Sequence, residues 1–267
     1  MVPAAGTLPT RSAGLIDFMV MVGKRVHALE AVDEHSRPVL LPSYGGTRRM
    51  PNLTALLALL LRRYGIPVLV HGPGEAAREC QRVTTIAVLR ELGIEPVKSI
   101  TEAQRRIVQE SIAYVPISLI APEIADFLEL QAPFGLHGDL RGLAQLIDPF
   151  GGAAFRVVGA WHPGDLPLLQ AYLRTTQANA LLLRATHGEP FADPRRQPRL
   201  ESFVGGVPTV LFDAAHGPPA VLAGLPRMLD ASTSAEWITA VLEGEQPVPA
   251  PIVNQLACCL LSGRRAA

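Results

Sequence analysis

The sequence predicts an α/β fold whose central, mostly parallel sheet is flanked by helices. Three observations support this prediction. Short apolar runs rich in valine and leucine alternate with longer segments of helical periodicity over most of the 267 residues. Residues 41–75 give the clearest unit, which reads loop, helix, strand, turn. Several apolar runs end in loops with glycine or histidine, where open α/β sheets bind their ligands.

The clearest unit contains a buried helix that we expect over residues 52–64. Asn52 can cap its first turn, and its leucines recur at the three- and four-residue spacing of an apolar face. Gly65 and Pro67 end the helix. The valine-leucine-valine run at 68–70 then predicts a buried parallel strand.

Two glycines precede this helix, Gly45 and Gly46, and they allow positive φ angles and a close approach of the backbone. A glycine turn ahead of a helix N-terminus favours anions, because its N–H groups are free and the helix dipole is positive there. We therefore expect a phosphate-binding loop. The alternative is a tight turn ahead of a core helix, since glycine is common in turns.

The same two periodicities place the other elements. A helical pattern covers residues 14–29. Further strands are expected at 39–41, 113–115, 155–160, 180–185 and 207–212. Further helices are expected at 75–92, 123–130, 140–147, 165–177, 235–243 and 251–262.

Composition narrows the class of protein. The 24 basic and 24 acidic side chains cancel, which disfavours a strongly basic nucleic-acid binder but allows a local basic surface. No apolar run reaches the roughly 20 residues of a spanning helix, and residues 1–10 lack the apolar core of a signal peptide. We expect a cytoplasmic protein without a membrane partner. The three cysteines, Cys80, Cys258 and Cys259, have no metal spacing and are expected to be reduced and buried.

Arginines gather around two of the expected loops. Arg48 and Arg49 follow the glycine turn, and a second group clusters around Pro194 and Pro198: Arg184, Arg195, Arg196 and Arg199. The planar guanidinium fork suits phosphate oxygens, so these side chains could line one cleft and follow a nucleic-acid backbone without reading its sequence. The alternative is a solvated surface.

Residues 45–54 (GGTRRMPNLT), followed by residues 70–72 (VHG), resemble glycosyltransferase family 3. This is the anthranilate phosphoribosyltransferase superfamily, which shares its fold with the class II nucleoside phosphorylases. The chain is most similar to the YbiB-type branch, a nucleic-acid-binding offshoot. That similarity lies in residues 42–46 (PSYGG), 70–72, 235–238 (AEWI) and 256–261 (LACCLL).

The resemblance implies a domain division and a set of site residues. Residues 1–36 would be the remnant of an N-terminal helical domain and 37–267 the phosphoribosyltransferase-like domain, with residues near 121–150 contributing to a small, truncated helical lobe. Family members pair through that lobe, so a homodimer is expected. The resemblance implies phosphate binding by Gly45, Gly46, Thr47, Asn52, Thr54, His71 and Gly72.

Most of the charged residues that the resemblance would imply for an active phosphoribosyltransferase are replaced in this chain. The lysine ahead of the His-Gly pair becomes Val70, the loop aspartate falls on Gly46, and only Glu189 remains near the paired magnesium carboxylates. His71 and His162 follow strands and could act as acid or base, but neither has a carboxylate partner visible in the sequence, which favours structural roles.

We therefore expect a non-catalytic, phosphate-recognising protein that binds single- or double-stranded nucleic acid without sequence preference and needs no cofactor. No residue is assigned a catalytic role. The alternative is a magnesium-dependent pentosyltransferase of tryptophan biosynthesis that transfers phosphoribose to anthranilate or a similar aromatic acceptor, with Glu189 as a metal ligand.

Overall fold

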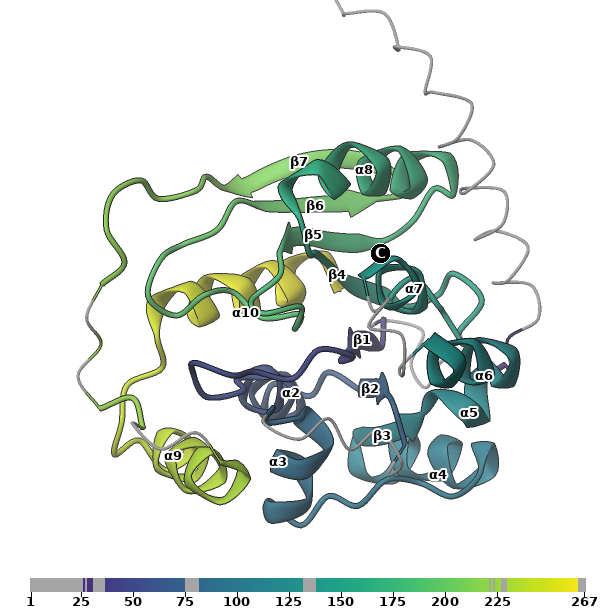
Figure 1. Cartoon of the computed structure of the whole chain (residues 1–267), viewed down its shortest axis with the longest axis horizontal. Helices are drawn as coiled ribbons and strands as arrows, with labels where there is room; N and C mark the ends of the chain where they lie inside the picture. Colours follow the sequence, from purple (N-terminus) through teal and green to yellow (C-terminus); the bar gives the residue numbers. More distant parts are fainter. Residues whose placement is uncertain are drawn as a thin grey trace, which may run out of the picture.

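The computed structural model describes residues 26, 28–30, 37–74, 82–131, 138–220, 222, 224–226 and 230–263. Its centre is a seven-stranded sheet in the order β3-β2-β1-β4-β5-β6-β7 (Figure 1). The strands are β1 (Val39–Pro42), β2 (Val68–Gly72), β3 (Ile112–Pro116), β4 (Phe155–Ala160), β5 (Ala180–Arg184), β6 (Leu200–Val204) and β7 (Val207–Phe212).

The sheet is mostly parallel, as the sequence predicts. β1 to β5 run parallel, whereas β6 and β7 are antiparallel to their neighbours. The chain moves outward from β1 to β2 and β3, then returns to place β4 on the other side of β1. The strand order therefore reverses between β1 and β4, and ligands of open α/β sheets bind at such a reversal, beyond the carboxyl ends of the strands.

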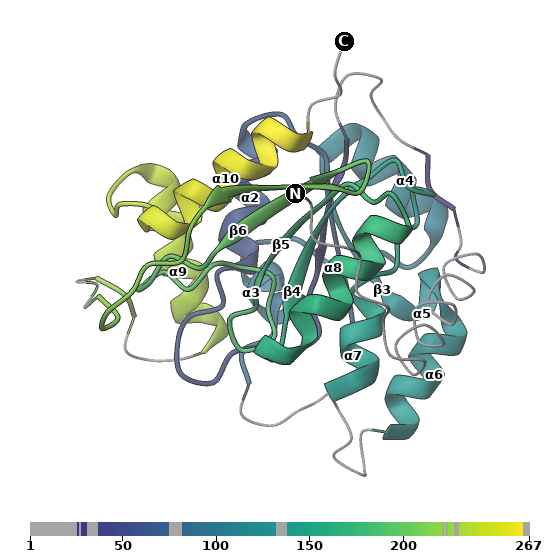
Figure 2. The ribbon, with the colours of Figure 1, turned by 90° about the horizontal axis from the view of Figure 1, so that it is seen from above.

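Helices cover both faces of the sheet (Figure 2). One face carries α2 (Thr54–Arg63), α3 (Thr85–Glu91), α9 (Ala231–Glu243) and α10 (Ala250–Gly263). The other carries α4 (Ile100–Glu110), α5 (Ile117–Ile120), α6 (Pro122–Gln131), α7 (Gly138–Ala144) and α8 (Leu166–Thr175). Side chains alternate between the two faces of the sheet along each strand, so both layers contain strand residues. Val39 and Leu41 pack in the first layer, whereas Leu40 packs in the second.

The leucine-rich helix α2 is buried along most of its length, as predicted. It begins at Thr54, two residues later than expected. Leu53 holds the cap position without a side-chain bond, but Asn52 Oδ1 accepts a hydrogen bond from Thr54 N at 3.1 Å. The Asn52 amide also donates to Val83 O at 3.0 Å, which ties the helix start to the segment ahead of α3.

The helix expected over 75–92 is shorter than predicted. α3 begins only at Thr85, behind the cap Thr84, because Val83 pairs with the backbone of Thr47 through bonds of 2.9 and 2.8 Å. Residues 75–81, including Cys80, lie outside the described residues. The pattern at 14–29 also lies almost entirely outside them, and residues 28–30 are not helical.

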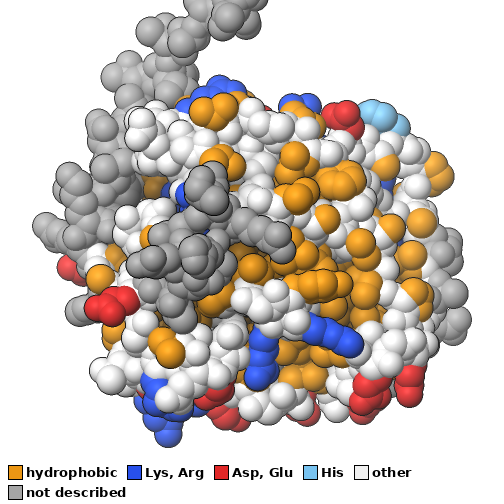
Figure 3. Space-filling view, turned by 180° about the vertical axis from the view of Figure 1, so that it is seen from behind, with side chains coloured by type: hydrophobic (Ala, Val, Ile, Leu, Met, Phe, Trp, Pro, Cys, Tyr) orange, Lys and Arg blue, Asp and Glu red, His pale blue; other side chains and the backbone are white. Residues whose placement is uncertain are grey.

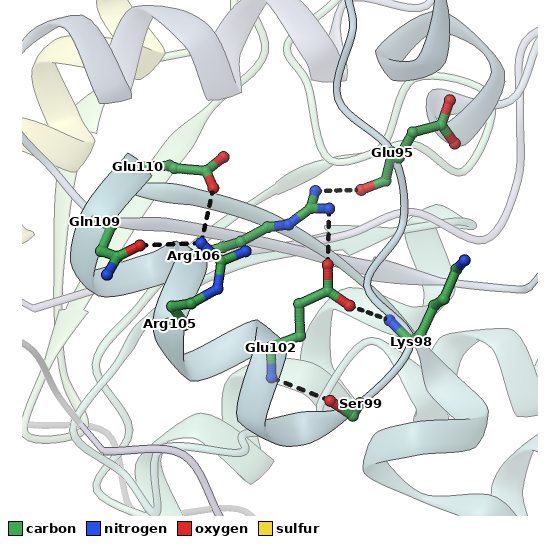
Figure 4. Close-up of polar contacts among 8 residues, drawn as sticks. All are labelled: Glu95, Lys98, Ser99, Glu102, Arg105, Arg106, Gln109 and Glu110. Carbon is green, nitrogen blue, oxygen red and sulfur yellow. Dashed lines mark hydrogen bonds and ion pairs between the residues drawn. The ribbon is translucent and has the colours of Figure 1, made fainter.

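Among the described helices and strands, α4, the short helix α5 and β6 were not predicted. α4 buries only Ala103 and Ile107, so its apolar stripe is too thin to recognise; Figure 4 shows that polar contacts cover its surface, including the 2.8 Å ion pair of Glu102 and Arg106. β6 contains Glu201 and Ser202, and its connection to β7 is a two-glycine turn.

The C-terminal helix α10 is expected from the sequence and buries both of its cysteines. Burial raises the pKa of Cys258 to about 12 and that of Cys259 further, so both thiols are protonated.

No helix among the described residues is long and apolar enough to cross a membrane. Apolar side chains gather near the middle of the face in Figure 3, with charged side chains mainly around them. The division of the chain at residues 36 and 37 stays a prediction.

Candidate functional site

The glycine loop after β1 encloses a carboxylate of the protein itself. The backbone N–H groups of Gly45 and Gly46 donate to Glu189 Oε1 at 2.9 and 2.6 Å. The other oxygen, Oε2, accepts hydrogen bonds from three hydroxyls, Ser43 at 2.6 Å, Thr54 at 2.9 Å and Thr85 at 3.0 Å. We call this set of five donors the Glu189 cradle.

A tight turn places the carboxylate of Glu189 in the cradle. Thr186 and Glu189 bond each other's backbone at 3.1 and 2.9 Å, and the two residues between them, His187 and Gly188, have φ angles of 55° and 85°. The Glu189 side chain is fully buried. A buried carboxylate is stable only when donors replace its water, and here both oxygens are supplied.

Of the other residues predicted to bind phosphate at this loop, Thr54 belongs to the cradle, whereas Asn52 and Thr47 adjoin cradle residues. Thr54 donates to Glu189, and Asn52 bonds Thr54 N and Val83 O. Thr47 is buried, and its hydroxyl has no hydrogen-bond partner among the described residues. The amides predicted to bind phosphate at this loop therefore bind Glu189 instead, and a phosphate could enter only by displacing it.

His71 and Gly72 lie at the end of β2, beside the cradle rather than in it. His71 is fully buried, and its Nδ1 lies 2.8 Å from the hydroxyl of Tyr44. Burial lowers the pKa of His71 to about 3, so the ring is neutral in the folded protein. A side chain at Gly72 would collide with the backbone carbonyl of Ser43 and the hydroxyl of Tyr114. Both residues therefore support packing of neighbouring strands.

A separate cleft of about 1250 Å³ opens beyond the carboxyl ends of β4 and β5. The loop after β1 contributes Arg48 and Arg49, residue 161 follows β4, Arg184 ends β5, and residues 185–188 follow β5. The cleft lies next to the reversal point of the sheet, because the loops after β1 and β4 both contribute to its lining. Six arginines of the described part of the chain line the cleft, and we call it the arginine cleft: Arg48, Arg49, Arg82, Arg184, Arg196 and Arg199.

Five of the six arginines predicted to bind nucleic acid line this cleft. The exception is Arg195, whose guanidinium pairs with both oxygens of Asp193 at 3.0 Å. Sequence reasoning missed Arg82, which was placed on a helix; it instead donates to the carbonyl of Gly45 at 2.9 Å. It also missed Trp161, whose position directly after a predicted strand was the available signal.

The arginine cleft is predominantly basic. Among the described residues, the carboxylates in its lining are Asp193 and Glu201; Asp193 pairs with Arg195, and Glu201 accepts a 2.7 Å hydrogen bond from Gln170. His187 also lines the cleft, and its pKa is lowered first by burial and then by the charge of Arg195. Most of the arginines are exposed, so their charges face solvent and an incoming ligand.

The described residues do not offer a cluster for a metal ion. No group of three or more histidine, cysteine, aspartate or glutamate side chains could hold one in that part of the chain. Glu189, the predicted metal ligand, uses both oxygens within the cradle. Magnesium prefers several oxygen ligands including carboxylates, so the described donor set does not fit it.

Comparison with known proteins gives one sequence relative and many structures. No family model matches the chain. It is 32% identical over 231 residues to the uncharacterized protein YbiB of Escherichia coli, covering 86% of this chain and 71% of YbiB. The fold resembles anthranilate phosphoribosyltransferase from Thermus thermophilus, with a TM-score of 0.67, 17% identity, and coverage of 94% and 74% of the two chains.

A second similar structure is the anthranilate phosphoribosyltransferase of Saccharomyces cerevisiae in complex with PRPP and Mg. Its TM-score is 0.64 at 10% identity, with 94% of this chain and 70% of that chain covered. At these identities the likeness shows the fold.

Proposed function

The chain belongs to the family of the Escherichia coli protein YbiB, and we propose that it binds nucleic acid through the arginine cleft without reading its sequence. The observation that carries this proposal is the meeting of six arginines from three segments of the chain in one cleft. A polymer with one phosphate per nucleotide meets several of these charges at once.

The geometry favours backbone phosphates over one small anion. Arg48, Arg49, Arg184, Arg196 and Arg199 are exposed and spread around a cleft of about 1250 Å³. Each can reach a different phosphate, and contacts of this kind position a nucleic acid without specifying bases. Net charge is zero over the chain, so the attraction is local to the cleft.

The alternative, transfer of phosphoribose to an aromatic acceptor, draws on the likeness to anthranilate phosphoribosyltransferases. Two features of this chain weigh against it. The Glu189 cradle fills the loop where the resemblance places diphosphate, and the described residues present no carboxylate cluster for magnesium. Incubation with phosphoribosyl pyrophosphate, magnesium and anthranilate tests this alternative directly: product formation would establish it.

Binding of a fluorescent 20-nucleotide single strand, measured by anisotropy between 25 and 300 mM salt, tests the proposal. We expect a logarithmic slope of about −3 or steeper, because at least five arginines displace counterions. Replacing Arg184 and Arg199 with glutamine should weaken binding and flatten the slope, whereas Arg62→Gln on α2, outside the cleft, should change neither. Absence of binding at low salt, or a flat salt dependence, would refute the proposal.

The homodimer and the cytoplasmic location belong to this proposal as well. Pairing through the helical lobe around α6 and α7 would place two arginine clefts in one particle. Sedimentation of the purified chain with and without DNA measures the stoichiometry, and a monomer throughout would contradict the pairing.

A further inference from the structure

We propose that Trp161 is a stacking platform for unpaired nucleobases, so that the arginine cleft prefers single-stranded over double-stranded nucleic acid. This inference rests on the proposed function, because it assigns the ligand class of the same cleft. It depends on a different observation, which is the position and support of one aromatic ring.

The backbone places Trp161 at the reversal point of the sheet. It directly follows Ala160, the last residue of β4, and its side chain lines the arginine cleft while remaining partly exposed. A large aromatic side chain that remains partly exposed among arginines is poorly explained by core packing. It is well placed to meet a ligand that enters the cleft.

The turn that carries Glu189 also supports this ring. A Cβ atom at Gly188 would lie 2.7 Å from Cη2 and Cζ2 of Trp161 and 2.9 Å from Cε2, so the glycine backbone packs against the indole. The φ angle of Gly188 is +85°, a conformation that side chains disfavour. Because Glu189 is anchored by five hydrogen bonds, the support under the ring is rigid.

The surroundings of the ring are amphipathic in the way a nucleotide is. Pro163, Leu166 and Pro167 line the same cleft as Trp161, together with Arg184 and Arg199. A purely anionic ligand would use the arginines and gain nothing from the apolar surface. A strand with exposed bases uses both, because its bases can lie on the indole while its phosphates meet the guanidinium groups.

Duplex bases are stacked on their neighbours and paired, so they cannot lie on the indole without being extruded at a cost in free energy. Stacking of one free base on an aromatic side chain changes affinity about 5- to 150-fold. The platform therefore adds affinity for single strands and none for duplexes, whereas the arginines act on both.

The test compares four probes with the same number of phosphates: single-stranded DNA, a DNA duplex of half its length, an abasic deoxyribose-phosphate strand and inorganic polyphosphate. For the wild-type protein we expect the single strand to bind at least 5-fold more tightly than the abasic strand. In Trp161→Leu, which keeps apolar volume, this ratio should fall toward one. In Trp161→Phe most of the ratio should persist.

Fluorescence gives a readout that a merely structural role would not move. The chain has two tryptophans, Trp161 and Trp237. In Trp237→Phe the remaining emission belongs to Trp161, and stacking should quench it with single-stranded DNA but not with polyphosphate. In Trp161→Phe, where only Trp237 emits, single-stranded DNA should leave the emission unchanged.

The outcomes separate the two proposals. Equal affinity for base-containing and abasic strands, with no quenching of Trp161, would overturn the stacking role while leaving the arginine cleft as a polyanion site. Failure of all four probes to bind would refute the proposed function itself. If Trp161→Leu does not fold, the probe ratio of the wild type and the quenching in Trp237→Phe still decide.

Discussion

The Glu189 cradle and the arginine cleft are both favourable to anions, yet one is closed and the other open. They share the turn at residues 186–189, whose His187 and Gly188 line the cleft while Glu189 enters the cradle. The cradle uses neutral N–H and O–H donors in a buried place, and the cleft uses exposed guanidinium charges. A set of backbone donors thus predicts that an anion binds, but not that the anion is a ligand.

The largest effect should follow removal of the internal anion. Glu189→Ala leaves two amides and three hydroxyls without their acceptor, so we expect a loss of about 3 to 5 kcal/mol in the free energy of unfolding. Urea denaturation measures it. Glu189→Gln is the matched control, because its amide keeps the shape and an acceptor oxygen; it should lose about 1 to 2 kcal/mol.

The Glu189→Ala variant should also vacate the cradle, which tests whether the cradle can bind an external anion as the arginine cleft does. We expect Glu189→Ala to gain calorimetrically measurable binding of inorganic pyrophosphate, which the wild type lacks at this site. If the variant is as stable as the wild type, or if it gains no pyrophosphate binding at the glycine loop, the cradle is not a phosphate-like site.

Acid should destabilise the fold through His71, next to the cradle. Burial lowers its pKa to about 3, whereas an unfolded histidine titrates near 6.5, so only the unfolded state takes up the proton between these values. Stability should therefore fall as pH decreases from about 6.5 to about 3, by on the order of 5 kcal/mol. His71→Gln should lose this part of the pH dependence; an unchanged profile would contradict the assignment.

Removing charges from the arginine cleft should weaken DNA binding but leave the free energy of unfolding nearly unchanged. Arg184 and Arg199 are exposed, so replacing both with glutamine should change the free energy of unfolding by less than about 0.5 kcal/mol per residue. Affinity for single-stranded DNA should fall about tenfold or more at low salt. A large loss of stability in this variant would show that the two regions do not divide structure from binding as we infer.

The smallest effect should come from His187 in the wall of the cleft. Its pKa is lowered by burial and then by Arg195, so the ring is neutral near pH 7 and gains its charge only at acidic pH. Because DNA phosphates stay ionised, binding should strengthen a few-fold as the pH falls below the ordinary histidine value of about 6.5. His187→Ala should show no such gain, and an equal gain in that variant would assign the proton to another group.

Much of the fold could be predicted because its signals are local. Strands such as β4 are continuous apolar runs, and α2 shows its leucine spacing within ten residues. α4 could not be found because its stripe is thin, and β6 because charged and polar residues interrupt its pattern. For the site, the sequence predicted five of the arginines that line the cleft but neither Arg82 nor Trp161.

By itself, the sequence determined the alternation of strands and helices, the buried helix α2 and a glycine turn able to receive an anion. Only the tertiary structure decided which anion the turn receives, because Glu189 is 144 residues from Gly45 and no short-range pattern connects them. Folding brings that carboxylate among five donors and places the arginines and Trp161 in the lining of one cleft.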